Sequence, residues 1–209
     1  MGLPVGRFVC ASNANNVLTE FIHTGVYDKN RPFHLTISPS MDILVSSNLE
    51  RLLYMLCGDE ATADYMAQLS ASGKYSVDAV TGDRIRSEFS AACCDDAATC
   101  AKIAGVWRDS RYLIDTHTGV AAAALDAYRA ESGDGTPTVI VSTASAFKFA
   151  ADVCTALGDD PGDDPLTALS AHCALPVPRP LSGLEDREVR FDGVSDKGDM
   201  RAAVDAFLG

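Results

Sequence analysis

The feature that most constrains the fold is a short apolar run followed directly by a helical pattern, which recurs three times along the chain. The three apolar runs are Arg7–Ala11, Arg111–Asp115 and Thr138–Ser142, and the last has the character of a buried parallel strand. Helical patterns follow them in residues 12–25, 119–131 and 145–158. Strands that alternate with helices form a parallel sheet, because each crossover lays its helix on a face of the sheet. The sequence therefore predicts an α/β fold in which a parallel sheet is flanked by helices.

A polar loop between two apolar segments stands out in the first third of the chain. A strand-like run from Phe33 is interrupted by Ser38-Pro39-Ser40 and resumes at Met41–Val45. A helix follows, because Ser47 and Glu50 have the spacing of a capping box and leucines then recur at helical period. Small hydroxyls and an acid in this position predict a strand, a polar loop and a helix that line a pocket. An ordinary surface crossover is the alternative interpretation.

Helices account for most of the residues that follow. The helix after the polar loop is expected to end at Gly58, and Asp59 is expected to cap a second helix that ends at Gly73. Two further helices are expected over residues 82–94 and 96–108.

An acidic, turn-forming segment, residues 159–165, interrupts the pattern near the end of the chain. We therefore expect two parts. Residues 1–158 form an α/β domain, and residues 159–209 form a carboxy-terminal extension that packs on it.

Composition and charge exclude several classes of partner. The chain has 209 residues, of which 47% are hydrophobic and 22% are charged, as is typical of globular proteins. The formal net charge of -12 argues against nucleic acid and against an anionic membrane surface, because long-range repulsion opposes both. The sequence contains no apolar run of membrane-spanning length and no signal-peptide pattern, so we expect a cytoplasmic protein.

The chain contains 7 cysteines, an odd number. They show neither the paired spacing nor the histidine partners of a zinc site, so no metal site is predicted. Buried, reduced thiols are the expected state.

The carboxyl ends of the predicted strands are the expected place for a ligand, because helix amino termini present free amide groups there. Three segments have that position: Ser12–Asn16, Asp115–Thr118 and Ser142–Ser145. Each also caps its own helix, and capping alone is the alternative interpretation for any one of them. His117, close to Asp115, is a candidate acid or base, although a histidine that fixes the turn is the interpretation we prefer.

The sequence Ser38–Leu53 resembles a signature segment of threonine synthase, the pyridoxal 5'-phosphate (PLP) enzyme that converts O-phosphohomoserine to threonine and phosphate. Cys10–Phe21 and Gly25–Tyr27 are similar to the segment that precedes it in that family, in the same order. The resemblance implies that the chain is a carboxy-terminal piece of threonine synthase, the second half of a PLP fold type II large domain. It also implies PLP and O-phosphohomoserine as ligands of the full-length enzyme, and the missing amino-terminal half as a partner.

Two later segments are similar to the same family. Ile114–Val120 is similar to a segment in which proline follows the aspartate and alanine replaces the glycine. Val141–Phe149 is similar to a segment that usually reads Ser-Thr-Ala-His-Pro-Ala-Lys-Phe, with Ser145-Ala146-Phe147 in place of His-Pro-Ala. A hydroxyl of that family segment lies against the pyridine nitrogen of PLP, which carries over to Thr143 with Ser142 as its neighbour. The resemblance also suggests five residues that line the substrate pocket: Asn13, Asn15, Ser38, Ser40 and Asp42.

The lysines determine what activity to expect. PLP catalysis requires a lysine that forms a Schiff base with the cofactor and later moves protons. The five lysines are Lys29, Lys74, Lys102, Lys148 and Lys197. None of them lies in a segment that resembles the family's Schiff-base segment. In the family, that lysine and a glycine-rich phosphate loop lie upstream of the segments matched here. The resemblance thus implies that this chain contains no catalytic residue and is inactive alone.

Two other interpretations stay open. The chain could be a short non-catalytic regulatory or binding module with the same fold, and in-frame upstream coding sequence with a lysine-bearing segment would argue against this. It could also be an unrelated doubly wound anion-binding protein. No P-loop or dinucleotide fingerprint supports that second alternative.

Overall fold

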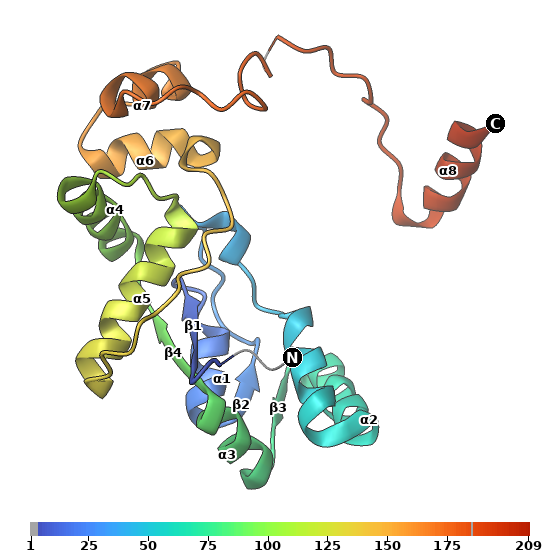
Figure 1. Cartoon of the computed structure of the whole chain (residues 1–209). Coiled ribbons are helices and arrows are strands. Elements are labelled where there is room, and N and C mark those ends of the chain that lie inside the picture. The colour runs from blue at the N-terminus through green and yellow to red at the C-terminus, as the bar shows by residue number, and fades with distance from the viewer. Residues whose placement is uncertain (1–3, 185) are drawn as a thin grey trace. The chain divides into compact units, whose positions relative to one another are not determined.

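The computed structural model describes residues 4–184 and 186–209, and it divides into two compact units (Figure 1). The first unit extends to Val177 and the second comprises Pro178–Gly209. Short 3-10 helices are labelled η. The elements of the first unit are β1 (Phe8–Ser12), α1 (Val17–Thr24), β2 (Val26–Asp28), η1 (Pro39–Met41), α2 (Ser47–Ser72), β3 (Lys74–Ser76), α3 (Ala79–Glu88), β4 (Phe89–Cys93), α4 (Asp96–Ser110), α5 (Thr116–Ser132), η2 (Ala146–Phe149), α6 (Ala150–Leu157) and α7 (Pro165–Cys173).

A parallel sheet is present, formed by β1, which was predicted, and by β4, which was not. The strands run in register from Phe8 opposite Phe89 to Ser12 opposite Cys93. Helices α1 and α5 both pack against this pair of strands. Because the strands are parallel, their carboxyl ends lie at one edge of the sheet, where the loops that follow them begin. The α/β class is therefore confirmed, and the predicted ligand edge is defined by Ser12 and Cys93.

Aromatic rings fill the core between α1, α2 and the antiparallel pair β2 and β3. Tyr27 lies opposite Tyr75 in that pair, and their rings stack with centroids 5.2 Å apart. Phe21 meets both rings edge-on at 5.8 Å, and Tyr65 stacks on Tyr75 at 5.3 Å. Phe21 is fully buried. These rings supply much of the apolar area that this core removes from water.

Helix α2 begins without the predicted capping box. Its N-cap is Ser46, and no side chain accepts a hydrogen bond from its first turn. The Tyr27 hydroxyl fixes this point instead, because it accepts from the Ser46 amide at 2.9 Å and donates to the Leu44 carbonyl at 3.0 Å. The predicted break at Gly58 is confirmed by a φ of 83°, a conformation that glycine adopts without strain. α2 is therefore two helices joined at that residue.

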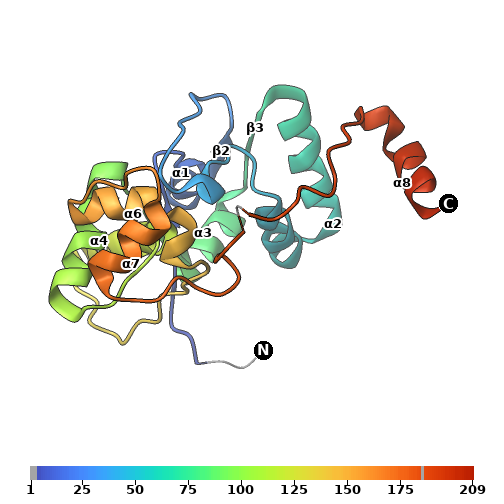
Figure 2. The same ribbon diagram turned by 90° about the horizontal axis from the view of Figure 1, so that it is seen from above.

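A second core joins α4, α5, α6 and α7, and Figure 2 shows α4, α6 and α7 grouped away from α2. Each of the four helices contributes a fully buried side chain, namely Ile103, Val120, Val153 and Leu169. A Cβ atom at Gly119 would lie 3.0 Å from side-chain atoms of Ile103 and Thr99, so the glycine allows α5 to approach α4 closely. These contacts place α7 with the first unit, whereas the division predicted from the sequence, after residue 158, assigned it to the extension.

Four segments predicted as strands contain no strand in the described part of the chain: residues 33–37, 41–45, 111–115 and 138–142. A strand requires a neighbour that pairs with its backbone amide and carbonyl groups. None of the four has such a neighbour among the described residues. The residue pattern of these segments is typical of strands, but it does not show whether a neighbouring strand is present to pair with them.

The prediction of a helix over residues 82–94 is wrong in its second half. Helix α3 ends at Glu88, and residues 89–93 form β4. Pairing with β1 overrides the local helix preference of Ala91 and Ala92, because packing in a sheet decides strand formation more than intrinsic propensity does.

The second unit contains η3 (Lys197–Asp199) and α8 (Met200–Leu208). The Phe207 ring of α8 meets the Phe191 ring edge-on, with centroids 6.0 Å apart. Within residues 4–184 and 186–209, no helix combines the length and apolar character that crossing a membrane requires.

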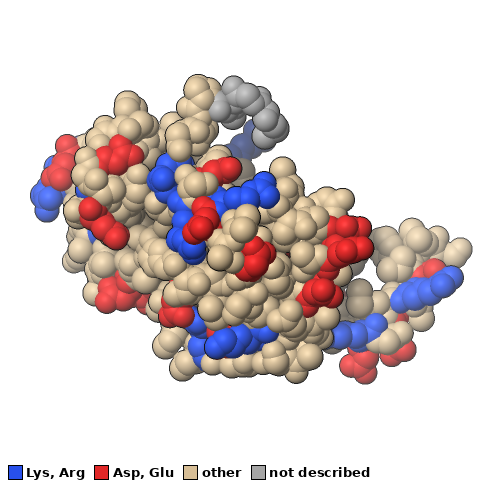
Figure 3. All heavy atoms as spheres, turned by 90° about the horizontal axis from the view of Figure 1, so that it is seen from below, with Lys and Arg blue, Asp and Glu red and all other residues tan. Residues whose placement is uncertain are grey.

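Charged side chains of both signs are interspersed on the face drawn in Figure 3, despite the net charge of -12. Ion pairs on the surface include Arg31 with Glu20 at 2.7 Å and Lys74 with Asp28 at 3.2 Å. Exposed pairs of this kind contribute little to stability, so the two cores carry the fold.

We predict that Phe21→Ala lowers the free energy of unfolding by about 3–4 kcal/mol, because it empties a fully buried site and removes two aromatic contacts. Phe207→Ala is the matched control, since that ring is 73% exposed. It should change the free energy by less than about 0.5 kcal/mol. Urea unfolding followed by circular dichroism measures both, and similar effects of the two variants would contradict the assignment of this core.

Candidate functional site

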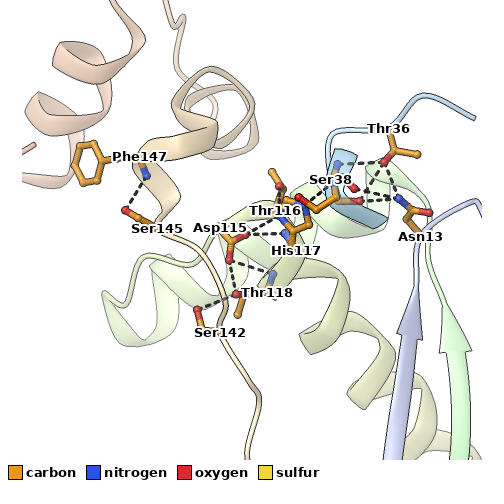
Figure 4. A network of polar contacts seen from close by, with 11 residues as sticks. Asn13, Thr36, Ser38, Asp115, Thr116, His117, Thr118, Ser142, Ser145 and Phe147 are labelled. Atoms are coloured by element: carbon orange, nitrogen blue, oxygen red, sulfur yellow. Dashed lines mark hydrogen bonds and ion pairs between the residues drawn. The ribbon is translucent and has the colours of Figure 1, made fainter. Parts of the chain in front are cut away.

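Asn13 follows β1 and organises the loop that faces it. Its side chain is 1% exposed. The amide Nδ2 donates to Thr36 Oγ1 at 2.8 Å, to Asp42 Oδ1 at 2.8 Å and to Ser38 Oγ at 3.0 Å. Ser38 is fully buried as well. These bonds hold residues 36–42 against the carboxyl end of β1 (Figure 4).

Asn15 and Asp42 close the same loop. Asn15 Oδ1 accepts from the His34 amide at 2.9 Å, and Asn15 Nδ2 donates to the His34 carbonyl at 2.8 Å. Asp42 accepts from Asn15 Nδ2 at 3.0 Å and from the Thr36 amide and hydroxyl at 3.0 and 2.8 Å. Side chains thus pair with the backbone groups that a strand over 33–37 would have offered to a neighbouring strand. This is the physical reason that the predicted strand is a loop.

His117 joins this loop to the start of α5. The Ser40 amide donates to His117 Nε2 at 3.1 Å, which makes Nε2 an acceptor and places the ring proton on Nδ1. Nδ1 then donates to Asp115 Oδ2 at 2.8 Å. The Phe149 ring covers the imidazole with its centroid 4.6 Å away. These contacts fit the structural role for His117 that the sequence analysis preferred.

Asp115 also links α5 to the segment predicted to meet PLP. It is the N-cap of α5 and accepts from the amides of His117 at 3.1 Å and Thr118 at 3.2 Å, and from the Thr118 hydroxyl. Because that hydroxyl donates to Asp115, its oxygen accepts from the Ser142 hydroxyl, 3.0 Å away. Thr143 comes next and is exposed, and its hydroxyl bonds to no other described residue.

The structure brings most of the predicted residues into two connected clusters at one edge of the sheet (Figure 4). Asn13, Asn15, Ser38 and Asp42 contact one another directly. Ser40 joins through its backbone amide and Ser142 through its hydroxyl. Thr143 adjoins this network without a bond to it. Thr36 was not predicted, because an isolated threonine in an apolar run has no spacing that indicates a role.

Two cysteine thiols in this part of the sheet, those of Cys10 and Cys94, are poor nucleophiles. Burial raises the pKa of the Cys10 thiol in β1. Burial, reinforced by the adjacent Asp95, also raises the pKa of the Cys94 thiol. Both thiols therefore stay protonated at neutral pH, and a protonated thiol is unreactive. In the described part of the chain all seven cysteines are free, and no cluster of His, Cys, Asp or Glu is arranged to hold a metal ion.

A separate pocket of about 390 Å³ opens at the amino-terminal edge of the same sheet, lined in part by Arg7, Arg86, Phe89 and Tyr128. The Arg7 guanidinium donates to the carbonyls of Arg86 at 3.0 Å and Phe89 at 3.4 Å and to the Ser90 hydroxyl at 3.2 Å. The N–H groups of the Arg7 guanidinium are therefore occupied by hydrogen bonds within the protein. We regard the carboxyl edge of the sheet as the stronger candidate site.

The family model described as "Threonine synthase, C-terminal" matches residues 118–207. The threonine synthase of Pseudomonas aeruginosa is 40% identical over 178 residues, which cover 83% of this chain and 36% of that protein. A protein named threonine synthase-like 1 from Mus musculus is 38% identical over 185 residues, which cover 85% of this chain and 24% of that protein.

Solved structures of threonine synthases share the fold. The PLP-bound threonine synthase of Brucella melitensis has a TM-score of 0.70 and 34% identity, covering 81% of this chain and 37% of that one. The yeast threonine synthase has a TM-score of 0.72 and 29% identity, covering 82% and 38%. The chain thus spans between 24% and 38% of the length of these relatives.

We predict that Asp115→Ala lowers the free energy of unfolding by about 3 kcal/mol, because several buried donors lose their acceptor at once. Asp95→Ala is the control, since Asp95 caps α4 in the same way but is exposed, and among the described residues its side chain accepts only from the Ala98 amide, at 2.8 Å. Loss of that cap should cost about 1 kcal/mol. Chemical denaturation of both variants measures the difference, and equal costs would contradict a central role of Asp115.

Proposed function

Because the chain belongs to the threonine synthase family, we propose that it is the carboxy-terminal part of an enzyme that uses PLP to convert O-phosphohomoserine and water to threonine and phosphate. We assign the chain to the second half of the PLP-binding large domain of that enzyme. An amino-terminal part of the enzyme is its proposed partner. A cytoplasmic location is consistent with the seven free cysteines.

This proposal rests on one observation. Segments that each resemble a threonine synthase segment in sequence meet at one edge of the sheet. Asn13 from the first segment bonds to Ser38 of the second. The Ser40 amide of the second bonds to His117 of the third, and Thr118 of the third bonds to Ser142 of the fourth. Polar segments that converge beyond the carboxyl ends of parallel strands have the arrangement of a ligand site.

The groups around Thr143 suit the pyridine ring of PLP. Thr143 and Ser142 offer neutral hydroxyls, whereas the carboxylate linked to this segment, Asp115, is fully buried and bonded to His117 and Thr118. A neutral hydroxyl opposite the pyridine nitrogen would leave that nitrogen unprotonated, whereas a free carboxylate there would stabilise its protonated form. When bound, PLP supplies the electron sink that loss of phosphate and addition of water require.

The remaining predicted residues divide into two roles. Asn13, Asn15 and Asp42 use their polar atoms on one another and on the loop, so we assign them to positioning. Ser40 differs, because its amide is held by His117 while its exposed hydroxyl bonds to no described residue. We therefore propose Ser40 and Thr143 as the side chains of this chain that touch the ligands.

We propose that the lysine that holds PLP lies in the amino-terminal part of the enzyme, so that the isolated chain is inactive. Lys148 is the one lysine in a segment that resembles the family, and it is exposed with its ammonium over the Phe149 ring at 5.9 Å. This is the position of a surface cation. A short non-catalytic regulatory or binding module with the same fold is the alternative.

We predict that the isolated chain forms no threonine from O-phosphohomoserine in the presence of PLP. Co-expression with the amino-terminal part of the Pseudomonas aeruginosa relative should restore phosphate release and threonine formation. In that complex Thr143→Val should lower kcat by at least about 10-fold, while Thr143→Ser, which keeps the hydroxyl, should stay within about 3-fold of the parent.

Thr155→Val is the matched control, because Thr155 is exposed on α6 and its hydroxyl bonds to no described residue other than Ala151, whose carbonyl accepts from it. Its kcat should equal that of the parent. Threonine formation by the isolated chain would refute the proposed division of the enzyme. Full activity of the Thr143→Val complex would refute the role of that hydroxyl, and a complex that forms but stays inactive would favour the non-catalytic module.

A further inference from the structure

The pocket at the amino-terminal edge of the sheet has the size and the lining of a second ligand site. Its volume of about 390 Å³ is within the range of pockets that hold small molecules. Its residues come from the starts of β1 and β4, from α1, and from the last turns of α3 and α5. The five-residue strands β1 and β4 separate it from the carboxyl edge. A ligand in this pocket therefore does not meet the residues proposed to touch PLP or the substrate.

Apolar side chains supply part of the lining. Ile22 of α1 and Ala91 of β4 are both buried. Phe89 is partly buried, and its ring stacks on that of Phe8 with centroids 5.2 Å apart. An apolar ligand group that covers these side chains removes apolar surface from water, which favours binding.

Ser90 supplies a donor that the protein does not use. Arg7 Nη1 donates to Ser90 Oγ at 3.2 Å, so the serine oxygen is the acceptor in that bond. The hydroxyl hydrogen of Ser90 bonds to no other described residue. A hydroxyl that accepts from a guanidinium becomes a stronger donor, because successive hydrogen bonds polarise one another. Although its own N–H groups are occupied, Arg7 also contributes a fixed positive charge, so this wall suits an anionic group.

Arg86 adds further donors on the same side of the pocket. Its Nη2 donates to Asp83 Oδ1 at 2.7 Å, in an ion pair whose carboxylate is exposed. Its Nε and Nη1 bond to no other described residue. The Arg86 carbonyl accepts from Arg7 at 3.0 Å, which fixes the backbone from which the side chain extends. A guanidinium with two free N–H groups matches the geometry of a carboxylate.

Glu131 gives the pocket a charge of the opposite sign. It lies in the last turn of α5, it is exposed, and its carboxylate pairs with no cation among the described residues. A simple anion in the pocket is repelled by Glu131, and a simple cation is repelled by Arg7 and Arg86. A ligand that carries both charges is attracted by both walls.

We infer that this pocket binds a small α-amino acid with an apolar side chain. The ligand carboxylate accepts from the Ser90 hydroxyl and the Arg86 guanidinium, and its ammonium donates to Glu131. Its side chain covers Ile22 and Phe89. This is a binding site additional to the proposed reaction, and it does not depend on that reaction.

The test is a titration of the isolated chain with L-leucine, followed by two-dimensional amide NMR. The dissociation constant should be about 1 mM or lower, as is usual for a ligand of this size. Amide signals of residues 89–91 and 128–132 should shift, whereas those of residues 13–16 and 36–42, at the carboxyl edge, should not. L-Leucinamide, which lacks the carboxylate, and 4-methylpentanoate, which lacks the ammonium, should each bind at least about 10-fold more weakly.

Two variants assign the charges to their residues. Arg86→Met and Glu131→Gln should each weaken L-leucine binding by at least about 10-fold. Arg86→Met should also abolish the difference between L-leucine and L-leucinamide, and Glu131→Gln the difference between L-leucine and 4-methylpentanoate. Arg51→Met and Glu60→Gln are the matched controls, because both residues are exposed on α2. Their binding should equal that of the parent.

Several results would overturn the inference. They are the absence of binding at about 10 mM L-leucine, equal binding of the three probes, and shifts centred on the carboxyl edge. The titration is repeated on the chain co-expressed with the amino-terminal part of the Pseudomonas aeruginosa relative, where the dissociation constant should stay within about 3-fold. Loss of binding in that complex would also overturn the inference, because the pocket would then be filled by the rest of the enzyme. Threonine formation by the complex tests the proposed function separately.

Discussion

The candidate site depends on one buried carboxylate. Asp115 is fully buried, and it accepts from the His117 ring, from two backbone amides and from the Thr118 hydroxyl. A charge in this position is tolerated only if donors surround it, so the start of α5, the tautomer of His117 and the orientation of Thr118 are set together. Through His117 the carboxylate reaches Ser40, and through Thr118 it reaches Ser142. Three loops that are distant in sequence are thereby held at one edge of the sheet.

The sequence was informative where structure is decided locally. The periodicity of Val17, Phe21 and Ile22 defined α1, and the glycine at 58 ended a helix as predicted. It was uninformative where pairing with a segment distant in sequence decides whether a strand forms. Ala91 and Ala92 favour a helix by themselves, and only pairing with β1 makes them a strand. The lack of a neighbouring strand also explains why residues 33–37 and 138–142 form no strand. In the first segment, the side chains of Asn15 and Asp42 bond to backbone amides, and the second segment has no partner among the described residues.

For the candidate site, resemblance selected residues that the pattern alone could not. Asn13, Ser38 and Asp42 lie together, but no spacing rule indicates that they bond to one another in place of a ligand. The contacts separate these from Ser40 and Thr143, whose hydroxyls bond to no other described residue. The buried amides and acid hold the loops, and we propose that the hydroxyls of Ser40 and Thr143 are the groups that reach the ligands. A rigid polar support beneath a few free groups is how enzymes keep reacting atoms in place.

We propose that this chain shapes the pyridine end of a PLP site, while the lysine that holds the cofactor lies elsewhere in the enzyme. The most direct measurement mixes the isolated chain with PLP, reduces it with borohydride and, after gel filtration, reads the absorbance spectrum and maps labelled peptides. If this proposal is right, no single one of the five lysines is labelled stoichiometrically. Stoichiometric labelling of one specific lysine would contradict it, because the chain would then carry its own cofactor-binding lysine.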